Sequence, residues 1–246
     1  MRPLHQGAAR PAVARASRRT RIYCRIGRSR AAAGASRLTR LPPIGAIVAG
    51  GESSRFGGAP KGLALVRGVR IIDRVAGALR AVTSELMLAG NAPDSSSWLA
   101  GARVVRDARI GRGSLIGLHT VLSNLPAPAE GVIVVAWDMP FVTPELLALL
   151  LESASGNTVA SIPEGPHGAE PMCAYYSRQC LPAVEAALDA GDLRLSLLVE
   201  RLAKVRRIPV AELSRLGDPE RLFFNVNTPR DLALAESMAA AEPRPG

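Results

Sequence analysis

The sequence contains only three cysteines, which are scattered at Cys24, Cys173 and Cys180. This number and spacing exclude a cysteine metal cluster and a disulfide framework, and they are typical of a protein from a reducing cytoplasm. Long apolar runs are also missing, because even the leucine-rich run at 146–151 lies between Glu145 and Glu152 and falls short of the roughly 18 residues that span a bilayer. We therefore expect a soluble, cytoplasmic protein without a membrane partner.

Acidic residues are absent from the first 40 positions, which hold eleven arginines. The other 206 residues carry 20 basic and 21 acidic residues, so the formal charge of +10 comes almost entirely from this N-terminal stretch. Residues 1–42 resemble a transit peptide or a disordered basic extension, and the same composition also results from a start codon assigned too far upstream in a GC-rich gene. With Tyr23 as its single aromatic residue and no recognisable module, this stretch does not predict a nucleic-acid partner.

After the double proline at 42–43, short apolar runs alternate with amphipathic segments. Apolar runs as uniform as 132–136 imply a parallel sheet that is covered on both faces, and the 48% hydrophobic content suffices for one substantial α/β core. We expect one catalytic domain over residues 43–240 and a frayed tail at 241–246. The predicted strands are 44–48, 86–89, 104–105, 132–136, 159–162 and 172–176, and the predicted helices are 71–82, 115–125, 144–152, 182–188, 195–203 and 232–238.

The first predicted strand leads into a glycine-rich loop, residues 48–62, with the sequence VAGGESSRFGGAPKG. Glycines after a strand leave main-chain N–H groups accessible to phosphate oxygens. The loop is not a Walker A motif, because Lys61 is followed by Gly62, and it is not a dinucleotide fingerprint, because about twenty residues separate the strand from the next helix. Lys61 is one of two lysines beside 29 arginines, which favours a compact ammonium for phosphate binding. The alternative is a flexible connection with solvated cations.

Acidic and amide side chains follow other predicted strands. Asp138 ends the most apolar strand, at the edge where parallel sheets bind ligands, and one carboxylate that joins Mg²⁺ to a triphosphate suits the coordination preference of this ion. The alternative for Asp138 is a cap for the following turn. Asp107 ends another strand and either contacts the nucleotide or forms a salt bridge with Arg106 or Arg109. The polar residues near later apolar runs are acceptor-binding residues or, alternatively, turn formers and a cap: Glu170, Asn225 and Asn227.

Taken together, these residues resemble the molybdenum cofactor guanylyltransferase family. The family signature of an apolar residue with Ala-Gly-Gly, then Arg, an apolar residue and Gly-Gly, then Lys-Gly-Leu, is matched at 48–51, 55–58 and 61–63. The similarity extends through the residues named above and covers about residues 44–240. Three departures stand out: Pro60 where the family usually has Asp, the run at 114–117 where Gly-Pro-Leu-Ala is commoner, and Trp137 in place of a frequent Cys.

The resemblance implies a Rossmann-like, three-layer α/β nucleotidyltransferase fold with a mostly parallel sheet. It also implies transfer of GMP from GTP to the terminal phosphate of molybdopterin, with Mg²⁺ as the cofactor and pyrophosphate as the product. In this assignment the nucleotide-binding residues are Val48, Ala49, Gly50, Gly51, Lys61, Asn91, Asp107 and Asp138, the catalytic residues are Arg55, Lys61 and Asp138, the metal ligand is Asp138, and the acceptor-binding residues are Glu170, Asn225 and Asn227.

The expected chemical step is in-line attack by the acceptor phosphate on the α-phosphorus. An anionic nucleophile needs no general base, so positioning and charge neutralisation provide the catalysis. Two alternatives remain: a related cytidylyl- or guanylyltransferase with another phosphorylated acceptor, and a catalytically silent protein that delivers or senses the cofactor. The sequence does not identify an oligomeric state, and we expect a monomer.

Overall fold

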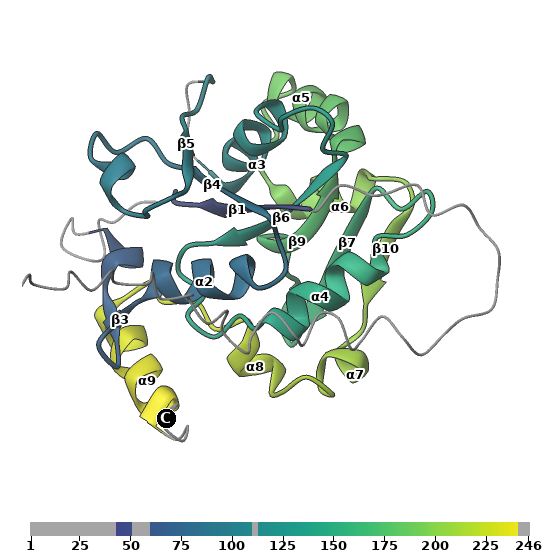
Figure 1. Ribbon diagram of the computed structural model, residues 1–246. Helices are drawn as coiled ribbons and strands as arrows, with labels where there is room; N and C mark the ends of the chain where they lie inside the picture. The colour runs from purple at the N-terminus through teal and green to yellow at the C-terminus, as the bar shows by residue number, and fades with distance from the viewer. Residues whose placement is uncertain (1–42, 51–59, 110–112, 241–246) are drawn as a thin grey trace, which may run out of the picture. The chain divides into compact units, whose positions relative to one another are not determined.

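The computed structural model describes residues 43–50, 60–109 and 113–240, which belong to one compact α/β unit (Figure 1). The strands are β1 (Ile44–Val48), β2 (Leu65–Val66), β3 (Val69–Arg70), β4 (Glu85–Ala89), β5 (Arg103–Val105), β6 (Gly131–Ala136), β7 (Ala160–Gly165), β8 (Gly168–Ala169), β9 (Cys173–Ser177) and β10 (Val205–Ile208). The α-helices are α2 (Ile71–Arg80), α3 (Ser114–Ser123), α4 (Pro144–Ser153), α5 (Leu181–Asp189), α6 (Leu195–Arg201), α7 (Val210–Leu213), α8 (Pro219–Leu222) and α9 (Pro229–Ala240), and the 3-10 helices are η2 (Lys61–Leu63), η3 (Ser95–Ser97) and η4 (Arg178–Cys180).

The central sheet has the strand order β10-β7-β9-β6-β1-β4-β5, with β8 paired to β7. Neighbouring strands along this order are parallel except at β9, which runs antiparallel to both β6 and β7. A separate hairpin is formed by β2 and β3. The sheet is therefore mostly parallel, as predicted.

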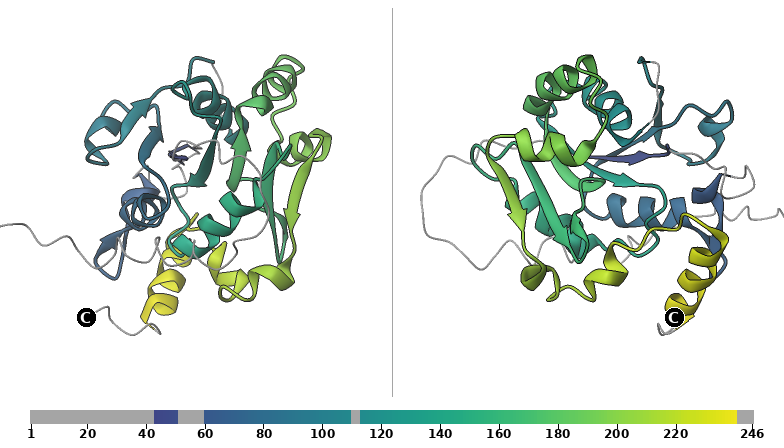
Figure 2. Two further views of the ribbon diagram at one scale, coloured as in Figure 1. Left: turned by 45° about the vertical axis from the view of Figure 1, so that its right-hand side comes forward. Right: turned by 180° about the vertical axis from the view of Figure 1, so that it is seen from behind.

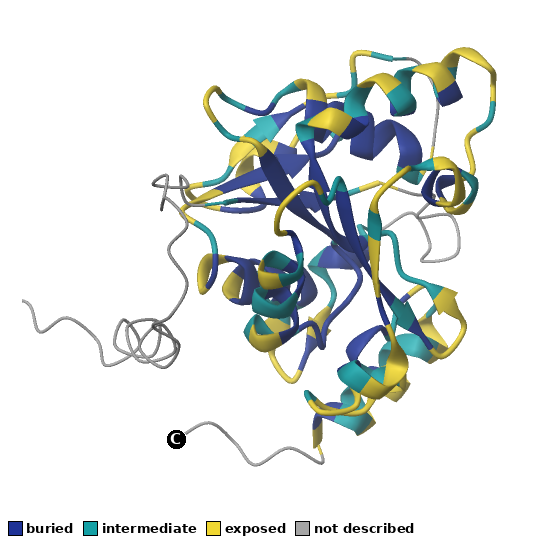
Figure 3. Ribbon diagram, turned by 90° about the vertical axis from the view of Figure 1, so that its right-hand side faces the viewer, coloured by how far each residue is buried: buried dark blue, intermediate teal, exposed yellow. Residues whose placement is uncertain are grey.

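Helices cover both faces of the sheet, so the fold has three layers (Figures 1 and 2). In one hydrophobic cluster α2 and α4 pack against Ile47 and Ile133, and in the other α3, α5 and α6 pack against Ala46 and Val134. Successive side chains of a strand point to opposite faces, which explains how β1 and β6 contribute to both clusters. Figure 3 shows the result, with buried strands between helices whose outer surfaces are exposed.

The predicted elements are present, with ends that shift by a few residues. The largest change is at the last helix, which begins at Pro229, three residues before the predicted start. Its first turn is stabilised by a capping box, in which the Asp231 amide donates to the Thr228 hydroxyl and the Thr228 amide donates to the Asp231 carboxylate. Helix α4 begins as predicted, with the Thr143 hydroxyl as its cap and Pro144 in its first turn.

The sheet reverses its strand order beside β1. The chain leaves β1, forms β4 and β5 on one side of it, and then forms β6 on the other side. Ligands of open α/β sheets bind at such a point, beyond the carboxyl ends of the strands. Within the described ranges, no helix is long and apolar enough to cross a membrane.

Candidate active site

The carboxyl ends of β1 and β6 form the centre of the candidate site. Val48 pairs with Ala136 at the last step of the ladder, and the Trp137 amide donates to the Val48 carbonyl at 3.2 Å. On the other side of β6, the Ala136 amide donates to the Met172 carbonyl at 2.8 Å, because antiparallel β9 begins where β6 ends. The residues that follow β1 and β6 and those that precede β9 therefore meet at one edge of the sheet.

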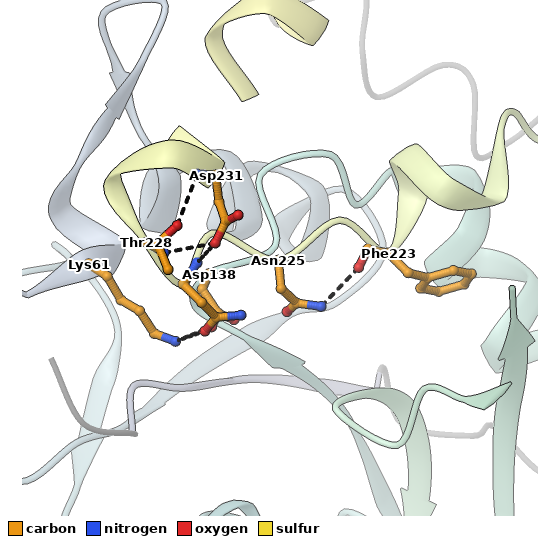
Figure 4. Close-up of polar contacts among 7 residues, drawn as sticks. Lys61, Asp138, Phe223, Asn225, Thr228 and Asp231 are labelled. Carbon is orange, nitrogen blue, oxygen red and sulfur yellow. Dashed lines mark hydrogen bonds and ion pairs between the residues drawn. The ribbon is translucent and has the colours of Figure 1, made fainter. Parts of the chain in front are cut away.

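Lys61, Asp138 and Asn227 form a hydrogen-bonded cluster at this edge. The Lys61 ammonium contacts the Asp138 carboxylate through Oδ2 and donates to the Asn227 side-chain oxygen at 2.7 Å. Lys61 is 8% exposed and Asp138 is 7% exposed, so water screens this ion pair weakly. The contact brings together three of the predicted site residues, and Figure 4 shows the pair beside the segment that leads into α9. The Asp138 carboxylate therefore faces a cation.

The segment at 225–227 is attached to the site through its main chain. The Val226 amide donates to the Asp138 carbonyl at 2.9 Å, and the Asn227 amide donates to the Asp231 carboxylate at 3.0 Å. The Asn225 side chain donates to the Phe223 carbonyl at 2.9 Å (Figure 4). The capping box of α9 thus fixes the position from which Asn227 reaches Lys61.

Trp137 supports the short helix η2 that carries Lys61. A Cβ atom at Gly62 would lie 2.4 Å from a carbon of the Trp137 ring, so η2 lies directly on the indole. The Trp137 ring also stacks on the ring of Trp98, with 5.3 Å between the ring centroids and 19° between the ring planes. Pro60 precedes η2 with φ −63°, the angle that a proline ring imposes. Of the three departures from the family pattern, Trp137 therefore packs against η2, and Pro60 has a backbone angle that suits a proline.

A pocket of about 340 Å³ opens at this edge. The predicted residues that line it come from four parts of the chain: Val48, Gly50, Asp138, Glu170, Asn225 and Asn227. Gly113 and Ser114 at the start of α3 also line it, and a helix N-terminus attracts anions. The close approach of α3 depends on Gly117, where a Cβ atom would lie 2.4 Å from Val48 Cγ1.

Asn91 and Asp107 form a second cluster, at the ends of β4 and β5. The Asn91 amide group donates to Asp107 Oδ2 at 2.5 Å, and the Asp107 main-chain amide donates to Asn91 Oδ1 at 2.9 Å. The Thr120 hydroxyl, on α3, donates to Asp107 Oδ1 at 2.5 Å. Arg109, one of the two expected salt-bridge partners of Asp107, pairs instead with Asp189 at 2.6 Å. Thr120 was not predicted as a site residue, because its position within the mostly apolar helix α3 does not indicate that its hydroxyl reaches Asp107.

Glu170 is half-buried at the entrance to β9. Its main chain is fixed by hydrogen bonds from its amide to the Pro163 carbonyl at 2.9 Å and from the Cys173 amide to its carbonyl at 3.0 Å. Burial raises the pKa of the Glu170 carboxyl to about 7, and the nearby His167 partly opposes this shift.

The residues at Asp138 fit a magnesium ion. Asp138 Oδ1 is buried and has no hydrogen-bond partner among the described residues, which leaves one carboxylate oxygen for a cation. The described part of the chain contains no group of three or more His, Cys, Asp or Glu side chains suited to a metal. Magnesium does not need such a group, because it commonly takes one or two carboxylates and completes its shell with water and substrate phosphates.

The remaining predicted site residues lie in or near the glycine-rich loop at 48–62. Gly51 and Arg55 lie outside the described residues. Val48 and Gly50 line the pocket, and Ala49 follows β1 with its amide bonded to the Ala89 carbonyl at 2.7 Å. The structure thus groups Lys61, Asp138 and Asn227 directly, and it places Asn91 with Asp107 in a separate cluster.

The sequence comparisons with known proteins indicate one family. A family model described as the MobA-like NTP transferase domain matches residues 45–205. The chain is 39% identical over 199 residues to a probable molybdenum cofactor guanylyltransferase of Pelotomaculum thermopropionicum, covering 81% of this chain and 94% of that protein. It is 34% identical to the molybdenum cofactor guanylyltransferase of Desulfosudis oleivorans, covering 80% of this chain and 96% of that protein.

The fold is also similar to a solved structure from the same group of proteins. Molybdopterin-guanine dinucleotide biosynthesis protein A from Archaeoglobus fulgidus superposes with a TM-score of 0.69 at 28% identity, covering 81% of this chain and 100% of that chain. The three-layer nucleotidyltransferase fold predicted from the sequence is confirmed. The chain belongs to the molybdenum cofactor guanylyltransferase family, within the MobA-like NTP transferases.

Proposed function

We propose that the protein transfers GMP from GTP to the terminal phosphate of molybdopterin and releases pyrophosphate, with Mg²⁺ as its cofactor. The observation that carries this proposal is the cluster of Lys61, Asp138 and Asn227 at the carboxyl ends of β1 and β6, beside a pocket of about 340 Å³. It places a buried cation and a buried carboxylate at the point of the sheet where a triphosphate is expected.

In the proposed reaction an oxygen of the acceptor phosphate attacks the α-phosphorus of GTP. The new phosphorus–oxygen bond forms as the bond between the α-phosphorus and the bridging oxygen breaks, and the electron pair leaves with pyrophosphate. Lys61 neutralises negative charge on the phosphates, and the N-terminus of α3 at Ser114 faces the same pocket. Magnesium held by Asp138 would supply further positive charge to the phosphate oxygens.

The guanine base is assigned to the second cluster. Asp107 is oriented by Asn91 and Thr120, and a carboxylate is a suitable acceptor for the adjacent N–H and amino groups of guanine. Acceptor binding is assigned to Glu170, Asn225 and Asn227, which line the pocket together with Asp138. The two free, buried cysteines of the described residues, Cys173 and Cys180, are in keeping with the reducing cytoplasm in which we place the enzyme.

The decisive experiment measures pyrophosphate release with each of the four ribonucleoside triphosphates, Mg²⁺ and molybdopterin. We expect release with GTP only when the acceptor is present. A preference for CTP would instead favour a cytidylyltransferase, and nucleotide binding without release would favour a silent carrier. Either result would contradict the proposal.

Two variants test the assigned residues in that assay. Asp138→Ala should abolish transfer, whereas Lys61→Ala should chiefly raise the KM for GTP and lower turnover. A matched control is Asp73→Asn, which removes a partly exposed carboxylate on α2 that pairs with Arg70, and this variant should keep full activity. Full activity of the Asp138 variant would disprove its role as a metal ligand.

A further inference from the structure

Lys61 lies behind the residues that face the pocket. Asp138 and Asn227 line the pocket, whereas Lys61 is not among the described residues that line it. Its buried ammonium contacts Asp138 Oδ2 and donates to Asn227 Oδ1 at 2.7 Å. The ammonium must therefore leave Asp138 before it can reach the phosphates of a nucleotide in the pocket.

The side chain of Lys61 can make this movement while its main chain stays in place. The turn of η2 is closed by a hydrogen bond from the Leu63 amide to the Pro60 carbonyl at 3.0 Å, and Gly62 packs on the Trp137 ring. A lysine has a flexible four-carbon stem, so its ammonium can exchange one partner for another from the same Cα position.

Asn227 holds the ammonium at Asp138. The main-chain amide of Asn227 donates to the Asp231 carboxylate at 3.0 Å, and this carboxylate also accepts from the Thr228 amide at 2.8 Å in the capping box of α9 (Figure 4). The side-chain oxygen of Asn227 is an uncharged acceptor, so it adds a hydrogen bond to Lys61 without adding a second negative charge. Asn227 is thus a positioning residue for Lys61.

Neither member of this ion pair can take a ligand alone at low cost. If a triphosphate takes Lys61, Asp138 is left as a buried, uncompensated charge next to a polyanion. If a divalent cation binds Asp138 Oδ1, it lies beside the ammonium on Oδ2 of the same carboxylate, and the two cations repel each other where water screens weakly. Both costs disappear when the two ligands bind together, because the metal replaces the ammonium as the latter moves to the phosphates.

We propose that the ion pair of Lys61 and Asp138 is a switch that makes the protein bind nucleotide and divalent metal together and neither of them tightly alone. In the free protein Lys61 is the internal counter-ion of Asp138, and Asn227 keeps it there. This inference rests on the proposed function for its two ligands, GTP and Mg²⁺, but not on transfer to molybdopterin.

Two calorimetric titrations without acceptor test the switch, one of MgCl₂ into nucleotide-free protein and one of GTP into protein in EDTA. The wild type should bind each ligand weakly. Lys61→Met should bind Mg²⁺ about tenfold more tightly or better, because the competing ammonium is gone. Asp138→Asn should bind GTP in EDTA about tenfold more tightly or better, because Lys61 is released to the phosphates. Wild-type affinity in either variant would overturn the proposal.

The double variant separates the switch from simple charge repulsion. When Lys61→Met is combined with Asp138→Asn, neither gain should remain, since the metal loses its carboxylate and the triphosphate loses its ammonium. If the double variant still binds GTP in EDTA as tightly as Asp138→Asn does, the gain comes only from the removal of a negative charge and the proposal fails. This comparison also decides the matter if Lys61→Met does not fold, because the double variant leaves neither charge of the pair unpaired.

A matched control makes the same kind of substitution outside the pocket. Glu164→Gln on β7 removes a carboxylate that pairs with Arg207 at 3.1 Å on the surface. This variant should match the wild type in both titrations, and a gain in affinity would show that the titrations report overall charge, which would overturn the proposal.

The titrations also distinguish this inference from the proposed transfer. A wild type that shows the expected binding but releases no pyrophosphate would reject the transfer and retain the switch. A wild type that releases pyrophosphate but binds either ligand tightly alone would retain the transfer and reject the switch.

Discussion

The two oxygens of Asp138 have different surroundings. Oδ2 contacts the Lys61 ammonium, whereas Oδ1 is buried without a partner among the described residues. Lys61 therefore stabilises a buried negative charge when no substrate is bound, in addition to its proposed role with phosphates. A buried pair of this kind is sensitive to the loss of one member, since the other is left as an uncompensated charge.

A double-mutant cycle measures this dependence. Lys61→Met keeps most of the side-chain volume and should lower the free energy of unfolding by about 3 kcal/mol, because it leaves Asp138 buried and unpaired. Lys61→Met combined with Asp138→Asn should be more stable than Lys61→Met alone. Urea denaturation gives these free energies, and a strictly additive cycle would show that the two charges do not interact.

Glu170 makes stability depend on pH. Its pKa is about 7 in the folded protein against 4.5 for the unperturbed group, so the folded state binds more protons than the unfolded state between these values. Its contribution therefore lowers stability as pH rises from 4.5 to 7 and stays constant above that range. Its neighbour His167 partly opposes the rise in the pKa of Glu170.

Glu170→Gln removes this titration. Relative to the wild type, the variant should gain thermal stability progressively as pH rises from about 5 to about 7 and then level off, and Glu164→Gln should show no such trend. The measurement is the difference in Tm between variant and wild type at a series of pH values. A difference that is constant across the series would be inconsistent with a raised pKa at Glu170.

Side-chain contacts between residues that are far apart in the sequence could not be predicted from the sequence. The sequence placed Lys61 in a phosphate-binding loop and Asp138 at a strand end, but it did not indicate that the two side chains touch. They are 77 positions apart, and their contact depends on η2 lying on Trp137. The pairing of Asp107 with Asn91 and Thr120 was missed for the same reason, because sequence periodicity reports only local structure.

Helix α3 shows how an element can be constrained by one residue. Glycine normally weakens a helix, so Gly→Ala at an unconstrained helical position stabilises by about 0.5–1 kcal/mol. At Gly117, however, a Cβ atom would lie 2.4 Å from Val48, which lines the pocket. The glycine lets α3 approach the end of β1.

Two alanine substitutions separate these effects. Gly117→Ala should destabilise by about 1–3 kcal/mol through overpacking and should also reduce turnover, because Val48 must move. Gly77→Ala, on the exposed side of α2 with no atom within 4 Å of its added Cβ, should be neutral or stabilising and fully active. Thermal denaturation and the pyrophosphate assay provide both readouts, and equal behaviour of the two variants would contradict the constraint.

The elements that the sequence predicted are those with long apolar patterns or clear caps. Strand β10 was missed because its edge position leaves Arg206 and Arg207 exposed, so it lacks a continuous apolar run. The hairpin of β2 and β3 was missed because each strand has two residues, although its turn at Arg67 and Gly68 has the positive φ angles of 50° and 75° that favour glycine. Short elements at the rim depend on tertiary contacts more than on periodicity.

For the whole molecule, charge separates the N-terminal stretch from the rest of the chain. Without residues 1–40 the formal net charge changes from +10 to about −1, because eleven arginines are lost. Deletion of these residues should leave Tm unchanged and should change the KM for GTP and kcat by less than about twofold. Retention of the protein on a heparin column at low salt should be lost. A large fall in kcat would instead show that the stretch takes part in catalysis.

The stacked pair of Trp98 and Trp137 has a practical consequence. The chain has two tryptophans, both belong to this stack, and one of them, Trp137, directly precedes the proposed metal ligand in the sequence. The entire indole emission of the protein therefore originates beside Asp138. If magnesium or a triphosphate binds next to that residue as proposed, the environment of the stack should change, and native tryptophan fluorescence would provide a label-free optical signal for occupancy of the site.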